Sequence, residues 1–411
     1  MMIKTLVASL RASFLSVADC IDDFHRPLFN GAFLTYVLIS YVEHLNLSDA
    51  AALIIEGVGD LLKLPLLALF FVLLLVSGRQ SWRRLLFSIV LVALSGITWI
   101  IGGSSRLFWA VLVVLSAGKV RMRDVARLVL VASLLVTGAA LVLWATGIAG
   151  DAVEASRATR ERFSLGFGHP NTLGLMLFTI CTSFTMFRDD RAPVFQSLVC
   201  AVCAAVTCIL PNSRTFALAL IAWPVLLWGL FLTRLRPRVR FGLVALLGAG
   251  ALVVIAGSLL SMVLFDGNNE LWTKLDGVLS GRLWYQSHYY SLHPVSLFGH
   301  EFTEFGTMVI SGKESFFVVD NAFCHIYLRF GLVGTAIVLI SLFSLMKKAL
   351  HEGYFGIMVA GLFFFVLLGA VEGCFMLVAH NIFLFSFSTL ASGERLDVLD
   401  DCGPLKREAL E

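Results

Sequence analysis

The chain has 411 residues, of which 58% are hydrophobic and 14% charged, and its mean hydropathy is +0.88. Soluble globular domains are about half apolar and about a quarter charged, so this composition excludes a soluble globule and indicates a membrane protein. The formal net charge of +3 is small, and the Lys and Arg residues are scattered among short connections, which excludes a nucleic-acid-binding role.

Apolar runs long enough to cross a bilayer recur along the chain without the period-two alternation of a membrane β-barrel. Because a bilayer leaves no backbone group free to bond water, these runs predict helices. We expect an all-α, polytopic transmembrane helical bundle of about 12 spans. Ahead of it, apolar residues of segment 3–21 follow one helical face, which predicts an interfacial helix. The spans are predicted near residues 28–43, 61–78, 84–102, 105–118, 125–149, 172–187, 193–210, 215–233, 241–265, 322–346, 354–372 and 374–391.

Every second connection between these spans is basic, which the positive-inside rule associates with the cytoplasm. This alternation predicts a single transmembrane domain over residues 1–411 with a cytoplasmic N-terminus. It leaves segment 150–171 and a long extracytoplasmic loop, 266–321, on the outside, where we expect the chemistry. The basic positions are Arg79, Arg83, Arg84, Lys119, Arg121, Arg123, Arg127, Arg188, Arg191, Arg234, Arg236, Arg238, Arg240, Lys347 and Lys348.

The first outer segment combines arginines with a turn motif, GFGHPNTLG, over residues 166–174. Pro170 and the flanking glycines suit a tight turn, with Asn171 or Thr172 capping the next helix. The helix amides, His169 and the arginines could converge there on an anion. The alternative is a simple turn with solvated arginines. The arginines of this segment are Arg157, Arg160 and Arg162.

A second outer turn, PNSRT over residues 211–215, places Arg214 at the start of a helix. A cation gains nothing from the helix dipole at that end, so an anionic ligand explains it better. The alternative is an arginine whose stem lies along the membrane interface while its charge stays in water.

In the long loop, the sequence GRLWYQSHYYSLHP over residues 281–294 has helical periodicity that ends before a proline. Arg282, Gln286, Tyr289 and His293 would share one face of that helix. Aromatic rings interleaved with hydrogen-bonding groups suit sugars, and the alternative is an amphipathic helix on the membrane surface.

The span after the long loop opens with Asp320 and Asn321 and carries His325 and Arg329 on one face. An arginine at membrane depth costs about 2.5–3.5 kcal/mol, so it should face a polar interior with a partner. That interior is either a substrate site or a structural ion pair, for which Glu372 is a candidate.

Of the eight cysteines, most fall within or beside apolar runs, where they pack as small hydrophobes. Cys200 and Cys203 form a CxxC inside a predicted span without a second ligand pair, so we expect packing, with no disulfide and no metal site. The sequence has no P-loop, Walker motif or GxSxG. We therefore expect no cofactor.

The order of these motifs resembles that of bacterial Wzy-type polysaccharide polymerases and, more distantly, of O-antigen ligases. The resemblance covers residues 150–345, and GHPN at 168–171 is its most specific element. The motifs that carry it are residues 166–174, the Asn212-Ser213-Arg214 turn, Gly281-Arg282 followed by Trp284, the Phe298-Gly299-His300 turn, and Asp320-Asn321 leading to Gly331-Leu332-Val333-Gly334.

The resemblance implies a fold of the lipid-donor, GT-C-like glycosyltransferase type in the cytoplasmic (plasma) membrane of a bacterium. The activity would be metal-independent polymerisation of undecaprenyl-pyrophosphate-linked oligosaccharides on the outer face, for capsule, exopolysaccharide or O-antigen. A flippase and a chain-length regulator are the implied partners, besides membrane lipid. O-antigen ligases carry histidine where this chain has Asp320, which favours a polymerase. Two alternatives stay open: ligase-like transfer to a lipid or cell-wall acceptor, and a non-enzymatic polysaccharide or lipid transporter.

Residue chemistry and resemblance together suggest roles for the candidate site residues. The departing pyrophosphate needs positive charge, and arginine holds phosphate oxygens bidentately. The attacking hydroxyl needs a proton acceptor, either Asp320 or His169. The expected phosphate ligands are Arg162, Arg214 and Arg282, and the other expected substrate-binding residues are Asn171, Tyr289, His325 and Arg329.

Overall fold

The computed structural model describes residues 24–396 except 78–80, 119, 151–161, 187–191, 234–235, 294, 303–306, 311–312, 317 and 355. The predicted interfacial helix lies outside the described residues. So do Arg79, Lys119, Arg157, Arg160, Arg188, Arg191 and Arg234.

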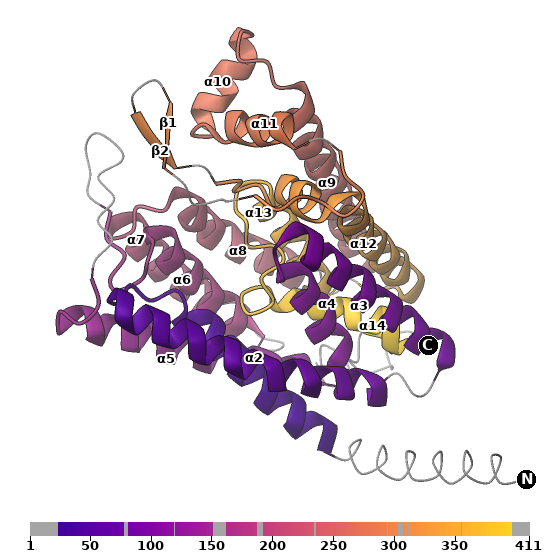
Figure 1. Cartoon of the computed structure of the whole chain (residues 1–411). Coiled ribbons are helices and arrows are strands. Elements are labelled where there is room, and N and C mark those ends of the chain that lie inside the picture. The colour runs from indigo at the N-terminus through magenta and orange to yellow at the C-terminus, as the bar shows by residue number, and fades with distance from the viewer. Residues whose placement is uncertain are drawn as a thin grey trace, which may run out of the picture.

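Helices make up most of the described chain (Figure 1). A first helix covers residues 24–42. It is followed by α2 (Asp49–Ser77), α3 (Trp82–Gly102), α4 (Arg106–Ser116), α5 (Met122–Ala145), α6 (Pro170–Thr185), α7 (Val194–Ile209), α8 (Arg214–Thr233), α9 (Pro237–Leu264), α10 (Glu270–Val278), α11 (Arg282–Leu292), α12 (Ala322–Glu352), α13 (Ile357–Gly369), the 3-10 helix η2 (Ile382–Phe387) and α14 (Ser388–Ser392). Strands β1 (Thr307–Ile310) and β2 (Lys313–Phe316) pair antiparallel, with Thr307 opposite Phe316.

Six of these helices, α2, α3, α5, α8, α9 and α12, are long and apolar enough to cross a membrane. This confirms a polytopic helical membrane protein, and the total of about 12 spans stays a prediction. Helix α4 has 11 residues and rises about 16 Å, roughly half the hydrocarbon thickness.

The predicted last span, 374–391, is not one helix. Turns lead into η2 and the five-residue α14. Polar side chains from within the run and from the first helix bond its irregular backbone. The Asn381 side chain donates to the Phe375 carbonyl oxygen (2.8 Å), and the Tyr41 hydroxyl donates to that of Ala379. Buried irregular backbone satisfied in this way is compatible with membrane depth.

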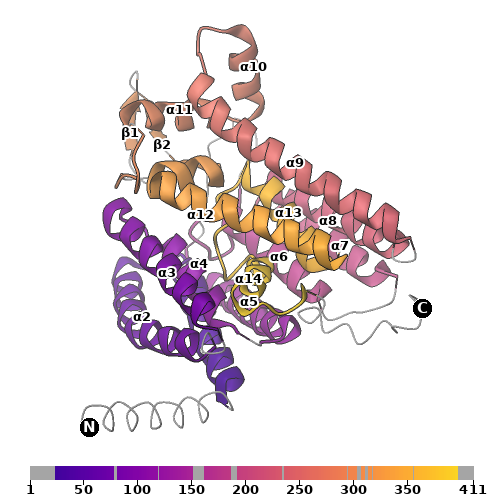
Figure 2. The same cartoon turned by 90° about the vertical axis from the view of Figure 1, so that its right-hand side faces the viewer.

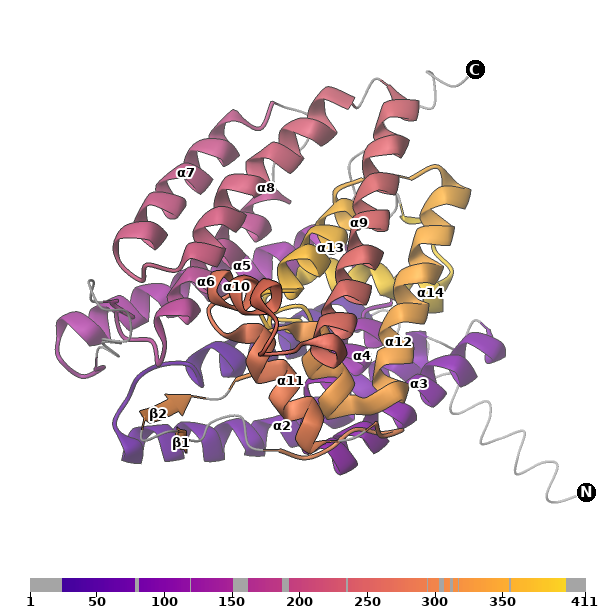
Figure 3. The same cartoon turned by 90° about the horizontal axis from the view of Figure 1, so that it is seen from above.

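The connections predicted to be extracytoplasmic gather at one end of the bundle, which we call the loop end. Helices α10 and α11 and the β-hairpin project there (Figures 1 and 2), and seen from above α11 lies across the end of α9 (Figure 3). The Asn46 N–H donates to the Gly166 carbonyl oxygen (2.8 Å), and the Phe163 N–H donates to that of Leu210 (3.0 Å). These bonds join three connections that are distant in sequence.

The connections predicted to be cytoplasmic gather at the opposite end, which we call the basic end. Arg26 forms an ion pair with Asp124 at the start of α5 (2.9 Å). Arg84 binds the carbonyl oxygen of Ser392, the last residue of α14, and Lys348 binds that of Glu394, two residues beyond it. These contacts join segments that the basic alternation assigns to one side, and the side itself stays a prediction.

Helix α12 is broken at Gly331, whose φ of 66° and ψ of −161° are not helical. The turn that contains Gly299 fills the break. The Leu332 N–H donates to the Ser296 carbonyl oxygen (3.0 Å), and the His300 N–H donates to that of Leu328 (3.0 Å). A Cβ on Gly331 would lie 2.4 Å from the Gly299 nitrogen, so two glycines are needed for this approach. The FGH and GLVG motifs are thus one structural clamp at the loop end.

Candidate functional site

A cavity of about 690 Å³ opens at the loop end, and we call it the arginine cavity. It lies among the turn before α8, the segment before α6, the start of α11 and the residues after α13. Four residues predicted for the site line it together: Arg162, Asn171, Arg214 and Arg282. Below them the lining is apolar, from one face of α8 and one of α13: Leu218, Ala219, Ala222, Phe364, Leu367, Leu368 and Val371.

The segment before α6 positions Arg162 against the turn before α8. The buried Arg162 side chain donates through Nε to the Pro211 carbonyl oxygen (2.9 Å) and through a terminal nitrogen to Asn171 Oδ1 (2.7 Å). One guanidinium therefore joins the GFGHPNTLG and PNSRT motifs, whose bonded residues Asn171 and Pro211 are 40 residues apart. Because Arg162 and Asn171 are bound to each other, they form a fixed polar wall.

Each part of the GFGHPN motif has a local structural reason. Gly166 lies against α5, since a Cβ at its φ of 88° would meet the Ala140 carbonyl oxygen at 2.6 Å. His169 caps α6, its Nδ1 accepting from the Asn171 N–H (3.0 Å), and Pro170 takes the first helical position. The His169 side chain is exposed and does not line the arginine cavity. Its role as a proton acceptor stays a prediction.

Arg214 is the first residue of α8, and its exposed side chain lines the arginine cavity. Within the described part of the chain it has no ion-pair or hydrogen-bond partner. The preceding Asn212 has a φ of 46°, which turns the backbone sharply between α7 and α8. An arginine without a carboxylate, beside a cavity and at a helix N-terminus, has its full donor set available for an anion.

Arg282 begins α11 and is held between two carboxylates. Its Nε donates to Asp320 (2.7 Å) and a terminal nitrogen donates to Glu372 (3.1 Å). The orientation of α11 comes from Asp276, whose Oδ1 accepts from the N–H groups of Leu283 and Trp284 (2.9 and 3.0 Å). The two carboxylates fix the orientation of the guanidinium, and its remaining N–H donors are available at the cavity.

Glu372 is a site residue that the sequence analysis did not assign to the substrate. It was considered as a partner of Arg329, and the structure pairs it with Arg282 at the wall of the cavity. Burial raises the pKa of the Glu372 carboxyl to about 7, and the Arg282 guanidinium opposes that rise. Hydrophobic periodicity does not mark a carboxyl in a turn after an apolar run. Glu372 is therefore recognised as a site residue only from its position in the structure.

Three other predicted site residues lie outside the arginine cavity. Arg329 donates to the carbonyl oxygen of Gly102 at the end of α3 (3.1 Å), and its guanidinium carbon lies 4.0 Å from the centre of the Phe302 ring. His325 and Tyr289 are buried beside the same phenylalanine. These contacts connect α3, α11 and α12 beneath the long loop. Substrate contact by Arg329, His325 and Tyr289 stays a prediction.

The charges of the site favour an anion. Three guanidinium groups line the cavity, and Arg282 alone is paired with the carboxylates of Asp320 and Glu372, which leaves a net positive charge that protonation of Glu372 would increase. Among the described residues, no group of three or more His, Cys, Asp and Glu side chains is arranged to hold a metal ion. The cavity therefore combines a cationic end with an apolar interior, which fits an amphiphile with an anionic head.

Comparison with protein-family models, with curated proteins and with solved structures found no match to this chain.

Proposed function

We propose that this chain is a glycosyltransferase that polymerises undecaprenyl-pyrophosphate-linked oligosaccharides, for capsule, exopolysaccharide or O-antigen, on the outer face of the cytoplasmic membrane. The observation that carries the proposal is the arginine cavity itself. Its cationic end faces the same side as the long loop, and its apolar wall follows the two helices α8 and α13. A lipid pyrophosphate has the same division between charged head and hydrocarbon chain.

The arginines support binding of the pyrophosphate as substrate and as leaving group. Arginine binds two phosphate oxygens at once through its planar fork, and its positive charge is most effective where negative charge develops. Arg214 is unpaired within the described chain and would provide the main contact. Arg282 is aligned by its carboxylates, so its remaining donors would be ordered before substrate arrives.

The transfer needs a proton acceptor for the attacking sugar hydroxyl, because the hydroxyl is a weak nucleophile while protonated. Asp320 and Glu372 lie on either side of Arg282 and are the nearest carboxylates to the phosphate site. Burial raises the pKa of the Glu372 carboxyl, which makes its carboxylate a stronger proton acceptor. In the proposed reaction the hydroxyl oxygen bonds to the anomeric carbon, the bond to pyrophosphate breaks, and the proton passes to a carboxylate.

The loop above the cavity would hold the glycan. Helix α11 presents half-buried Trp284, Tyr285 and Tyr290, with Trp284 stacked parallel to His288 at a ring-centre distance of 5.0 Å. Such faces suit the apolar sides of sugar rings. A flippase that supplies the lipid-linked repeats and a chain-length regulator are the partners that this function requires.

Mass analysis of lipid-linked glycans in a deletion strain tests the proposal. We expect single lipid-linked repeats on the outer leaflet and no long chains. Polymer of normal length that stays on its carrier would contradict polymerisation and indicate a ligase. Repeats confined to the inner leaflet would indicate a transporter.

A further inference from the structure

A second cavity, of about 230 Å³, lies between α3, α4, α12 and the C-terminal helices, and we call it the apolar cavity. Its lining is hydrocarbon apart from two serines on α12. The lining includes Phe87 and Leu91 of α3, Ala110 of α4, and Ile337 and Ile340 of α12. None of its lining residues belongs to the arginine cavity.

The helices that form this cavity continue into a basic rim. On α3, Arg83 precedes Phe87 by four residues and shares its face. On α12, Lys347 follows Ser344 by three residues. Both cations are exposed, and within the described chain neither has an ion-pair partner. The basic rim therefore consists of two cations, Arg83 and Lys347, each about one helical turn from a residue that lines the apolar cavity.

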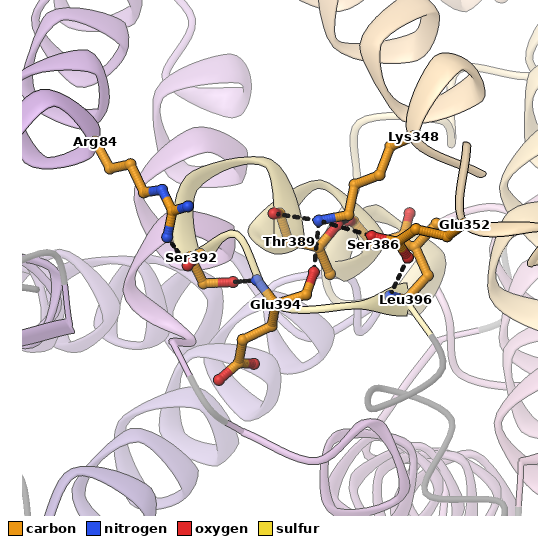
Figure 4. A network of polar contacts seen from close by, with 8 residues as sticks. All are labelled: Arg84, Lys348, Glu352, Ser386, Thr389, Ser392, Glu394 and Leu396. Carbon is orange, nitrogen blue, oxygen red and sulfur yellow. Dashed lines mark hydrogen bonds and ion pairs between the residues drawn. The ribbon is translucent and has the colours of Figure 1, made fainter. Parts of the chain in front are cut away.

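The neighbouring cations are already engaged, as Figure 4 shows. Lys348 donates to the Thr389 carbonyl oxygen (2.9 Å) and to that of Glu394, and it forms an ion pair with Glu352 (3.5 Å). Arg84 donates to the Ser392 carbonyl oxygen. These bonds hold α14 against the bundle end by satisfying its last carbonyl groups. They leave Arg83 and Lys347 for a ligand.

We propose that the apolar cavity and its basic rim bind one anionic phospholipid of the cytoplasmic leaflet. An acyl chain would occupy the cavity, and the phosphate would contact Arg83 and Lys347. The basic end is cytoplasmic by the positive-inside rule, and basic pockets between spanning helices on that side bind anionic lipid headgroups.

The surroundings of the rim agree with a headgroup at this level. Trp82, at the start of α3, is 76% exposed, and an exposed tryptophan at a helix end is typical of the membrane interface. A zwitterionic lipid has a positive group beside its phosphate and gains less from two unpaired cations than an anionic lipid does. The lipid would also fill the space between α3, α12 and α14, where protein side chains leave a hollow.

Native mass spectrometry of the purified full-length protein tests this proposal, with phosphatidylglycerol and phosphatidylcholine as probes. We expect one tightly retained phosphatidylglycerol and no retained phosphatidylcholine. The double variant Arg83→Gln/Lys347→Gln should bind phosphatidylglycerol roughly 30-fold more weakly, because each cation near a membrane surface favours an anionic lipid. Arg236→Gln/Arg238→Gln, which removes two exposed cations at the start of α9, should change binding little.

Two variants that fill the cavity separate a chain site from simple surface attraction. Ala110→Phe and Ser341→Phe both place a ring in the lining and keep the basic rim, so they should reduce phosphatidylglycerol retention. Using both variants keeps the test valid if one does not fold. Equal retention of the two lipids, unchanged binding by the double variant, or displacement of phosphatidylglycerol by undecaprenyl phosphate would overturn the proposal. Because activity is not measured, these outcomes are independent of the proposed function.

Discussion

At the scale of single residues, the two arginines at the mouth of the arginine cavity have different surroundings. Arg282 donates to two carboxylates, whereas Arg214 has no partner within the described chain. A guanidinium already bound to carboxylates offers fewer donors to a phosphate. We therefore expect Arg214 to contribute mainly by binding and Arg282 mainly by ordering the site.

Lysine at either position should reduce polymer formation strongly, since it keeps the charge and loses the planar fork. For Arg214→Lys we expect roughly a hundredfold slower reaction, the loss of about 3 kcal/mol of transition-state stabilisation. Arg282→Lys should be similarly impaired, because one ammonium does not reproduce its contacts with both Asp320 and Glu372. A reconstituted polymerisation assay measures both variants.

Arg236→Lys is the matched control for this pair, because Arg236 is an exposed arginine at the basic end. It should leave the rate unchanged. Full activity of Arg214→Ala and Arg282→Ala, at normal abundance and with correct topology, would remove both residues from the mechanism.

The buried carboxyl of Glu372 makes stability depend on pH. Its pKa is raised from 4.5 to about 7, so the folded protein favours the protonated form. The contribution to stability is therefore complete below pH 4.5 and is lost as the pH rises through 7. Glu372→Gln should match the wild type in thermal unfolding at pH 4 and exceed it at pH 8. An equal difference at both pH values would show that Glu372 does not titrate in this range.

At the scale of elements, the clamp between the break in α12 and the Gly299 turn determines where the long loop returns to the bundle. Gly331 has a φ and ψ that are accessible essentially to glycine alone. Gly331→Ala should lower the free energy of unfolding by at least about 2 kcal/mol, from backbone strain and the close approach of Gly299. Thermal denaturation in detergent measures the loss.

Gly257→Ala, in the regular part of α9 with open space around its Cα, is the control and should be neutral or slightly stabilising. If Gly331→Ala were as stable as this control, the break in α12 would not depend on glycine.

Local periodicity predicted the elements well and their long-range contacts poorly. The helix expected from residue 281 to the proline at 294 is α11, and the turn expected at 168–171 begins α6, because caps and proline act within a few residues. The irregular backbone of the last predicted span is bonded by Tyr41, whose hydroxyl reaches the Ala379 carbonyl oxygen from the first helix. Like that bond, the bonds from Arg282 to Glu372 and from Arg329 to Gly102 are encoded by no spacing along the chain.

At the scale of the whole molecule, the orientation of the bundle determines on which side of the membrane the arginine cavity opens. Loops assigned to one side by their charge contact one another in the structure, and so do those of the other side. Labelling with a membrane-impermeant thiol reagent, in a background without cysteines, tests the orientation. Ser287→Cys on α11 should react from outside, and Ser81→Cys before α3 should not. The reverse pattern would place the arginine cavity in the cytoplasm.

The central claim is that the arginine cavity binds a lipid pyrophosphate, and the most direct measurement is the affinity of the purified protein for undecaprenyl pyrophosphate. Native mass spectrometry should show one bound molecule, with the affinity lowered about tenfold or more by Arg214→Ala and unchanged by Arg236→Ala. Absence of binding to the wild-type protein, or equal binding by Arg214→Ala, would contradict the claim.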